Sequence, residues 1–290
     1  MDVTSNILLV GGGGLGVIVA LSLEASGRAR VTAALRSNYH VVNTKGYSIR
    51  SCDHGEMKGW RPTEIVNHIP RVTSDGKSFD YIVITTKNVP GIGQDVAELI
   101  APAVSPGITV IVLLQNGLNI ERPYSEQYPE NIILSGVSFA GSQEVTPGTI
   151  EHGSHDHLLL GAFPNPNVDV ACGEAAAKTF VSLYAASGRA SCFYTADAML
   201  HRWRKLVYNA TINPLCAITN LDSGSLRQSG PQITMLIEGA MGEILAVSAA
   251  SGHILPPGTA QELLNLDAVE EHFEPSMLHD VRKGNFIEYE

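Results

Sequence analysis

The sequence predicts an α/β domain followed by an all-α domain, and three observations indicate this order. Short apolar runs alternate with helix-like segments through the first half of the chain, which is typical of a parallel sheet covered by helices on both faces. A glycine-rich turn joins the first apolar run to the first helix-like segment. After Tyr194 the strand signal nearly disappears, so we expect the α/β domain at residues 1–194 and the helical domain at residues 195–290.

Mostly apolar runs define the expected strands of the first domain. They lie at residues 7–10, 30–35, 81–86 and 109–114. Helix-like segments lie between them at residues 15–26, before Ile100 and after Asn119. Because polar residues are scarce in these runs, we expect the strands to be buried on both faces, as in a parallel sheet.

The segments that follow have other patterns. Residues 131–162 alternate in polarity and contain Gly and Pro turns, which indicates antiparallel strands added at the sheet edge. Residues 170–187 predict a helix and residues 191–194 a last strand. Leu, Ile and Met then recur at three- and four-residue spacings, which predicts helices at residues 196–217, 231–251 and 259–272.

Composition limits the class of protein. The chain of 290 residues has 19 basic and 29 acidic side chains, a net charge of −10, which disfavours partners such as nucleic acid or an anionic membrane surface. The four cysteines are far apart and show no C-x-x-C spacing (Cys52, Cys172, Cys192, Cys216). We therefore expect no metal site and no disulfide framework. This cysteine usage suits a reducing compartment, and we expect a cytoplasmic protein.

One apolar segment, residues 7–23, lies where a secretory signal would lie. No basic residue precedes it and four consecutive glycines interrupt it, whereas a signal sequence has a positive start and a continuous apolar core. We find no other stretch that approaches the length of a membrane span, so no membrane segment is expected.

The glycine-rich turn carries the first functional signal. It consists of Gly11, Gly12, Gly13, Gly14, Leu15 and Gly16, and it contains the pattern G-x-G-x-x-G. Between a predicted strand and a predicted helix, this pattern is typical of a Rossmann-type dinucleotide-binding domain. Glycine lets the backbone approach a pyrophosphate, and the helix N-terminus supplies unpaired N–H groups to that anion. A glycine-rich turn without a ligand is the alternative.

The end of the second predicted strand indicates which dinucleotide binds. An acidic residue there would bind the ribose hydroxyls of NAD, but this chain has Leu35-Arg36-Ser37-Asn38. A guanidinium can bind the 2′-phosphate of NADP through two hydrogen bonds. Arg36 therefore predicts NADP, with an ordinary solvated arginine as the alternative.

A polar stripe marks the helical domain. Lys205, Asn209 and Asn213 are spaced i, i+4 and i+8 in a predicted helix, which would place them on one face. Pro214 follows and predicts a kink where the stripe ends. Exposure to solvent is the alternative explanation for these three polar residues.

Together these motifs resemble the ketopantoate reductase (2-dehydropantoate 2-reductase) family over nearly the whole chain. The matching pieces are GGGGLG, the LRS that ends the second strand, TTK at 85–87, QNG at 115–117, WRKLVYNATINPLCAI at 203–218 and PSMLHDVRKGNFIE at 275–288. The pattern W-R-K-L-x-x-N-x-x-x-N-P is quite specific. The resemblance implies a Rossmann domain, a helical domain and an active site in the cleft between them.

The resemblance implies catalytic and cofactor-side roles for four residues. Lys205 is the general acid, and Glu288 lies beside the reacting groups and the cofactor. Asn116 lies between nicotinamide and substrate, and Lys87 lies on the cofactor side. The alternatives are a turn position for Asn116, a residue that only terminates its strand for Lys87, and an ordinary exposed acid for Glu288.

The resemblance also implies a set of substrate-binding residues. Asn209 and Asn213 hold the substrate, and Ser276 meets its carboxylate, unless Ser276 is only a helix N-cap. A further substrate-binding asparagine is expected just before a glycine in the loop after this helix, and Ser223 takes that place here, ahead of Gly224. This departure leaves the specific 2-oxo acid open.

Two other features depart from the family pattern. The chain stops at residue 290 where relatives continue for another helix or so, which leaves open a helical domain truncated at its C-terminus. The stretch EHGSHDH contains His152, His155 and His157. We interpret these as surface histidines of a strand rather than metal ligands, because no supporting second shell is visible.

Together, the motifs and the resemblance predict an NADP-dependent oxidoreductase that reduces a 2-oxo acid to a 2-hydroxy acid. By resemblance, the leading reaction is 2-dehydropantoate (ketopantoate) to pantoate, a step of pantothenate biosynthesis, and a homodimer is a possible assembly. Two alternatives stay open at this point: a paralogue that reduces another 2-oxo or imino acid, and a catalytically idle NADP-sensing protein.

Overall fold

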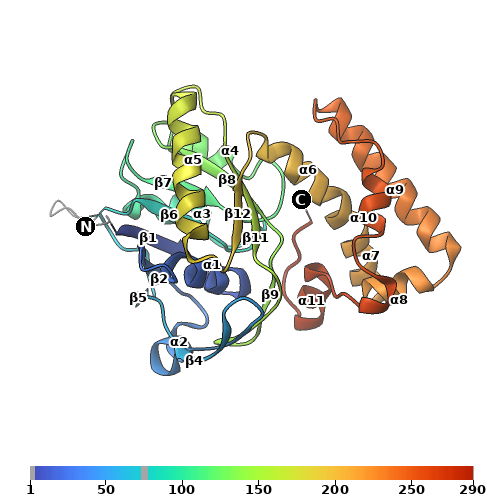
Figure 1. Cartoon of the computed structure of the whole chain (residues 1–290), viewed down its shortest axis with the longest axis horizontal. Coiled ribbons are helices and arrows are strands. Elements are labelled where there is room, and N and C mark those ends of the chain that lie inside the picture. The colour runs from blue at the N-terminus through green and yellow to red at the C-terminus, as the bar shows by residue number, and fades with distance from the viewer. Residues whose placement is uncertain (1–3, 73–77, 290) are drawn as a thin grey trace. The chain divides into compact units, whose positions relative to one another are not determined.

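A computed structural model describes residues 4–72 and 78–289 and divides the chain into two compact units (Figure 1). The first unit contains the chain up to Lys87, then Gly91–Gln115 and Asn119–Ala198. The second unit contains Asn88–Pro90, Asn116–Leu118 and the chain from Met199 onward. The units thus divide at Ala198 rather than at Tyr194, and two short loops of the N-terminal half belong to the second unit.

The first unit is built on an eight-stranded sheet with the order β12-β11-β8-β7-β6-β1-β2-β5. Its strands are β1 (Ser5–Val10), β2 (Ala29–Ala34), β5 (Glu64–Val66), β6 (Tyr81–Ile84), β7 (Val110–Leu113), β8 (Ile133–Ser138), β11 (His157–Ala162) and β12 (Ser191–Tyr194). Among the described residues, every pairing in this sheet is parallel except that of β8 with β11. The expected Rossmann-type parallel sheet is confirmed.

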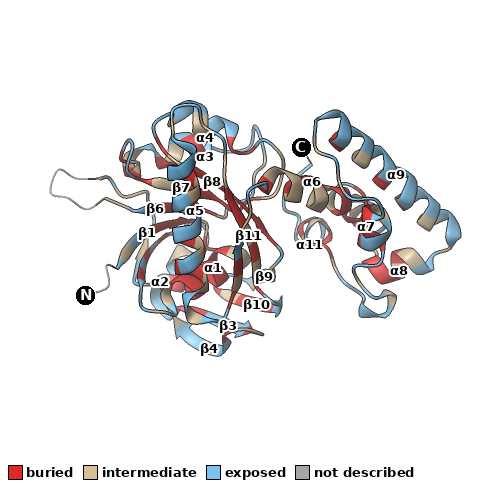
Figure 2. Cartoon of the chain, turned by 45° about the horizontal axis from the view of Figure 1, so that its top comes forward, coloured by how far each residue is buried: buried red, intermediate tan, exposed pale blue. Residues whose placement is uncertain are grey.

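Helices cover both faces of this sheet, as the apolar runs predict. Ile7 and Leu9 of β1 pack into one core with α1 (Gly14–Glu24) and α5 (Val170–Tyr184). Leu8 and Val10 pack into a second core on the opposite face with α3 (Val96–Ile100) and α4 (Arg122–Gln127). Successive strand residues point to opposite faces, so a strand between two cores has no polar face. Figure 2 shows the strands of this sheet as largely buried.

A second sheet of four strands, in the order β4-β3-β10-β9, corrects the expectation for residues 131–162. Its strands are β3 (Tyr47–Ser51), β4 (Gly55–Trp60), β9 (Gly141–Thr146) and β10 (Thr149–Ser154), with α2 (Tyr39–Lys45) before β3. β9 and β10 are antiparallel as expected, but β10 pairs with β3 and does not extend the large sheet. The partner strands lie about a hundred residues earlier, in a segment too weakly patterned to be recognised.

The second unit is helical, as expected. Its helices are α6 (Ala198–Asn209, the first residue of which belongs to the first unit), α7 (Ile212–Thr219), α8 (Ser223–Gln228), α9 (Pro231–Ala250), α10 (Thr259–Leu264) and α11 (Ser276–Lys283). Across both units, the described residues also form three short 3₁₀ turns, at Ala101–Ala103, Ala185–Ser187 and Val269–Glu271. The core of this unit gathers apolar residues from most of its helices, including Val207, Ile212, Leu226, Met241 and Leu278.

Two helix predictions in this unit were wrong in extent. The segment 196–217 is two helices, because the chain breaks at Thr211, whose hydroxyl donates to Val207 O over 2.6 Å. Pro214 lies in the first turn of α7 and cannot donate to the carbonyl of Ala210 four residues earlier, so the break between Asn209 and Ile212 agrees with the interruption expected from this proline. The segment 259–272 ends its α-helix at Leu264, and Asp267 beyond it accepts a short hydrogen bond from Tyr208.

Helix α9 corrects the expectation that no segment reaches the length of a membrane span. Within the part of the chain that the structure describes, it alone combines sufficient length with an apolar composition, at a mean hydropathy of 1.5. Helices of soluble cores pass the same test of length and composition. Most of α9 is exposed within its unit, including Met235, Leu236 and Val247.

A buried polar network lies in the first unit, between α1, α5 and the turn of the β3–β4 hairpin. Asp156 is fully buried, and its Oδ2 accepts hydrogen bonds from Tyr184 Oη at 2.7 Å and Ser22 Oγ at 3.0 Å. The His54 ring lies 3.4 Å from Ser22 Oγ. Burial lowers the pKa of His54 to about 4, helped by the Arg189 guanidinium. Burial raises the pKa of Asp156.

The pKa of His54 predicts a loss of stability in acid. The unfolded chain binds a proton near pH 6.5, whereas folded His54 does so only near pH 4, so stability falls as the pH drops through this range. A shift of this size corresponds to about 3 kcal/mol of unfolding free energy between pH 7 and pH 4. Urea unfolding at both pH values should show a smaller acid loss for His54→Gln than for the wild type. Replacing the exposed His68 by Gln should leave the acid loss unchanged, and an unaltered loss in His54→Gln would contradict the assignment.

Candidate functional site

The glycine-rich loop connects the end of β1 to the start of α1, as expected from its sequence context. Val10 at the end of β1 pairs with Ala34 at the end of β2 and with Ile84 at the end of β6. The loop, Arg36 and Lys87 therefore all follow strands that end at one edge of the parallel sheet. Ligands of such sheets bind outside the carboxyl ends of the strands. Gly13 is the N-cap of α1 and provides no side-chain cap for its first N–H groups.

The loop glycines divide into two kinds. A Cβ atom added at Gly11, Gly12, Gly14 or Gly16 would lie within 3 Å of protein atoms; at Gly16 it would lie 1.9 Å from Gly11 O. A Cβ added at Gly13 would meet no atom of the described residues within 4 Å. Four glycines are thus required by the protein's own packing, whereas Gly13 faces open space where a ligand can approach the backbone.

The structure leaves the two predicted cofactor-side cations exposed. Arg36 lies two residues beyond the end of β2, and its side chain is available to an anion at this edge. Lys87 lies three residues beyond the end of β6 and is also exposed. No acidic residue occurs between Ala34 and Asn38, so the position that would bind ribose hydroxyls has a cation nearby instead.

A polar cluster in the second unit brings together three residues predicted from the sequence. Lys205 Nζ donates to Asn116 Oδ1 at 2.9 Å, and Asn116 Nδ2 donates to Glu288 Oε2 at 3.2 Å. Glu288 Oε1 accepts a hydrogen bond from the backbone N–H of Asn88 at 2.9 Å. Asn116 therefore links an ammonium to a carboxylate, with its oxygen toward the first and its nitrogen toward the second.

The environment of Lys205 brings its ionisation close to neutral pH. Burial, followed by the neighbouring Arg202 guanidinium, lowers the pKa of Lys205 to about 8, and Glu288 opposes this shift. Arg202 is buried and donates to Gly117 O over 3.0 Å, which fixes it beside the same loop. A half-buried amine with a lowered pKa is suited to proton transfer.

Arg202, Gly117 and Asn88 were not singled out from the sequence. Arg202 lies one residue before the WRK motif, so the motif itself could have drawn attention to it. Asn88 takes part through its backbone N–H, and no side-chain pattern identifies such a contact.

The predicted substrate-binding residues differ in the helix on which they lie and in how far they are buried. Asn209 ends α6 and Asn213 begins a new helix, so they do not continue one helical stripe. Ser223 is buried next to the Tyr208 hydroxyl, and Asn213 Oδ1 is buried and has no hydrogen-bond partner among the described residues. Buried polar atoms without partners are uncommon and can mark the place of a ligand. Ser276 is exposed in the first turn of α11, whose N-cap is Pro275, so Ser276 is not the cap.

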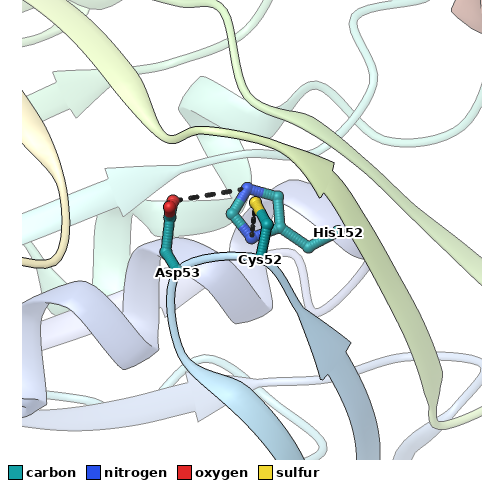
Figure 3. A group of neighbouring side chains, drawn as sticks. All are labelled: Cys52, Asp53 and His152. Carbon is teal, nitrogen blue, oxygen red and sulfur yellow. Dashed lines mark hydrogen bonds and ion pairs between the residues drawn. The ribbon is translucent and has the colours of Figure 1, made fainter.

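A cluster of Cys52, Asp53 and His152 offers three ligand atoms within 4.8 Å of one another (Figure 3). Ser51 Oγ accepts the backbone N–H groups of Asp53 and His54, at 3.2 and 3.0 Å, and lies 2.9 Å from His152 Nδ1. His152 Nε2 lies 3.9 Å from Asp53 Oδ2 and is buried without a hydrogen-bond partner among the described residues. Ser51 thus occupies one ring nitrogen of His152, and the other faces Asp53.

The other histidines of this stretch also make protein contacts. His155 is exposed and hydrogen-bonds Asp53 and Ser191, each at 2.8 Å. His157 stacks between Phe139 and Phe193, with ring centroids 5.6 and 5.5 Å away. His152 itself is buried, so it is not the surface histidine that strand alternation suggested.

A glycine loop at the edge of a parallel sheet, together with a helical unit that carries a lysine–amide–carboxylate cluster, is typical of two-domain oxidoreductases that use a dinucleotide. The sequence model described as Ketopantoate reductase PanE/ApbA matches residues 7–165. The model described as Ketopantoate reductase PanE/ApbA C terminal matches residues 197–290. The chain belongs to the ketopantoate reductase family.

Individual relatives agree with this membership. An uncharacterized protein of Saccharomyces cerevisiae is 33% identical, over 99% of this chain and 85% of its own length. The crystal structure of 2-dehydropantoate 2-reductase from Methylococcus capsulatus is 29% identical with a TM-score of 0.78, and the match covers 97% of this chain and 86% of that one. The ternary structure of D-mandelate dehydrogenase with NADH and anilino(oxo)acetate shares the fold, at 19% identity, a TM-score of 0.78 and coverage of 96% and 85%.

The two kinds of loop glycine predict two kinds of alanine variant. Gly16→Ala should lower the unfolding free energy by about 1–3 kcal/mol, because its Cβ would overlap the carbonyl of Gly11. Gly13→Ala should leave stability nearly unchanged and weaken the binding of a nicotinamide dinucleotide, because its Cβ would occupy the ligand side of the loop. Urea unfolding and calorimetric titration of both variants check this. Equal destabilisation by the two, or unchanged dinucleotide affinity in a folded Gly13→Ala, would contradict it.

Proposed function

We propose that this protein reduces a 2-oxo acid to a 2-hydroxy acid with NADPH, and that ketopantoate is its leading substrate. The observation that carries the proposal is the cluster in which Lys205, with a pKa of about 8, is held by Asn116 and linked through it to Glu288. Family membership supports oxidoreductase chemistry. The lysine cluster supports a reaction in which an oxygen atom gains a proton.

The residues of the glycine loop fit a dinucleotide. Gly13 is open to a ligand, and the N-terminus of α1 has no side-chain cap, so its N–H groups suit a pyrophosphate. Arg36 and Lys87 are exposed cations near the same edge and suit the additional phosphate of NADP. The bound dinucleotide supplies a hydride; the protein supplies orientation and a proton.

Lys205 acts as the general acid. Reduction of a keto carbon places negative charge on its oxygen, and protonated Lys205 stabilises and then neutralises that charge. Asn116 Oδ1 accepts one N–H of the ammonium and so orients it. Glu288 holds the opposite end of the Asn116 amide, which keeps the amide oxygen directed at the lysine.

The substrate is held by polar groups of the helical unit. Asn213 Oδ1 is buried without a partner among the described residues, Ser223 is buried next to the Tyr208 hydroxyl, and Asn209 is half-buried on the helix of Lys205. A hydroxyl and amides of this kind suit the hydroxyl and carboxylate groups of a small oxo acid. Ser276 is exposed at the start of α11, where it can meet a carboxylate.

Ser223 favours a second candidate, a paralogue that reduces a different 2-oxo acid. The serine side chain is shorter than the asparagine side chain of the family pattern, so it extends less far toward a substrate hydroxyl. An idle NADP-sensing protein is disfavoured, because Lys205, Asn116 and Glu288 still form a connected cluster. Assembly as a homodimer and a cytoplasmic location stay predictions for this chain.

Activity toward a panel of 2-oxo acids tests the function, with NADPH oxidation as the measurement. We expect ketopantoate to give the highest kcat/KM and the rate to fall above about pH 8, as Lys205 loses its proton. Lys205→Ala should lose roughly 10²–10⁴-fold in kcat, as general acids usually contribute, while it still binds NADPH. The exposed Lys178→Ala is the matched control and should keep full activity. A near-normal kcat in Lys205→Ala would exclude this mechanism.

Cofactor choice is tested at Arg36, because the D-mandelate dehydrogenase of similar fold was solved with NADH. Charge-assisted hydrogen bonds contribute about 1.5–3 kcal/mol, so Arg36→Ala should weaken NADPH roughly ten- to a hundredfold and NADH little. Arg30→Ala, on the strand that precedes Arg36 and also exposed, should change neither affinity. Equal losses for both dinucleotides in calorimetric titrations would show that Arg36 does not bind the 2′-phosphate.

A further inference from the structure

We propose that Asn38 and Tyr47 are positioning residues for the cofactor, because together they hold the carbonyl of Gly12 and so set the orientation of the dinucleotide loop. We call Asn38, Tyr47 and Glu144, which anchors Asn38, the Gly12 clamp. The proposal rests on the proposed function, in that it takes the glycine loop to bind a dinucleotide.

Two side-chain donors converge on one backbone oxygen. Asn38 Nδ2 donates to Gly12 O over 2.8 Å, and Tyr47 Oη donates to the same oxygen over 3.0 Å. A carbonyl oxygen has two lone pairs, so these two bonds use its full capacity. Asn38 is 5% exposed and Tyr47 is 1% exposed, so water does not readily replace either donor, and losing one leaves a buried group without its partner.

The clamp draws its members from three segments that are distant in sequence. Asn38 precedes α2 at its N-cap position, yet its side chain makes no cap hydrogen bond and turns to Gly12 instead. Tyr47 begins β3. Glu144 of β9 accepts the other N–H of the Asn38 amide at 2.9 Å and the backbone N–H of Gly148 at 2.8 Å. Asparagine at an N-cap normally serves its own helix, so its use here indicates a different role.

The chemistry of both donors suits this arrangement. Burial and the nearby Glu144 carboxylate raise the pKa of Tyr47, so its hydroxyl keeps the proton that it donates. The Asn38 amide has two N–H groups, one for Gly12 O and one for Glu144. Because the carboxylate accepts only from the nitrogen end of the amide, it fixes which end of Asn38 faces the loop.

The orientation of the Gly12 carbonyl determines the orientation of the next N–H. The described residues contain no cis peptide bond, and in a trans peptide the C=O and the following N–H point in opposite directions. Holding Gly12 O toward Asn38 and Tyr47 therefore turns the N–H of Gly13 away from them. Gly13 is the loop glycine at which an added Cβ would meet no atom of the described residues within 4 Å. The clamp therefore fixes the Gly12–Gly13 peptide in one orientation, with this N–H available to a ligand.

Such an N–H would bind the pyrophosphate, a group that all nicotinamide dinucleotides contain. The clamp should therefore affect NADPH and NADH equally, whereas Arg36 should affect NADPH alone. This difference separates loop positioning from recognition of the 2′-phosphate.

Calorimetric titration of Tyr47→Phe and Asn38→Ala with NADPH and with NADH tests the clamp. Each variant should weaken both dinucleotides by a similar factor of roughly three to ten, the usual value of one neutral hydrogen bond. In steady-state assays KM for NADPH should rise while kcat at saturating NADPH changes little. Unfolding midpoints without ligand are measured in parallel, and the titrations are made well below them.

Tyr184→Phe is the matched control. It also removes the hydroxyl of a buried tyrosine in the first unit, one that donates to Asp156 and not to the loop. It should alter stability and leave both dinucleotide affinities unchanged. Wild-type affinities in folded Tyr47→Phe and Asn38→Ala, or equal losses in Tyr184→Phe, would overturn the clamp while the proposed function stands. A wild-type protein that binds neither dinucleotide would overturn the proposed function and the clamp with it.

Discussion

The close approach of β1 to α1 is the constraint on which the cofactor edge of the sheet depends. Gly11 O lies where a side chain at position 16 would begin, so the helix can start here only if that residue is glycine. The carbonyl is not left unpaired, because Thr85 Oγ1 donates to it over 2.8 Å. One contact thus explains two separate motifs, the last glycine of the loop and the first threonine of TTK.

A different constraint governs the cluster of Lys205, Asn116 and Glu288, where a half-buried ammonium is hydrogen-bonded by an amide rather than by a carboxylate. A direct ion pair with Glu288 would favour the charged lysine strongly and raise its pKa. Asn116 stands between them, so the carboxylate acts on Lys205 at a distance while Arg202 and burial act in the opposite direction. The balance leaves the pKa of Lys205 at about 8.

The sequence predicts features that depend on local pattern and misses those that depend on distant pairing. The parallel strands and the glycine loop follow from periodicity and motif, and Lys205, Asn116 and Glu288 were singled out together by the family resemblance. The second sheet was missed because β3 pairs with β10 across roughly a hundred residues, and the alternation of a short strand does not identify its partner. The helix break follows from Pro214, whereas the Thr211 hydroxyl bond to Val207 that accompanies it has no compositional signal. The contact of Asn38 with Gly12 was not predicted, since the amide is held by Glu144 far along the chain.

The assignment of Asn88–Pro90 and Asn116–Leu118 to the helical unit bears on how the protein matures. Glu288 lies 172 residues after Asn116 and 200 after Asn88 along the chain. During synthesis, the two loops leave the ribosome long before the carboxylate that holds them. Contacts of such large sequence separation form late, because the chain must first be ordered in between. The lysine cluster is therefore assembled among the last parts of the molecule, and an incomplete chain with a well-formed sheet has no organised proton donor.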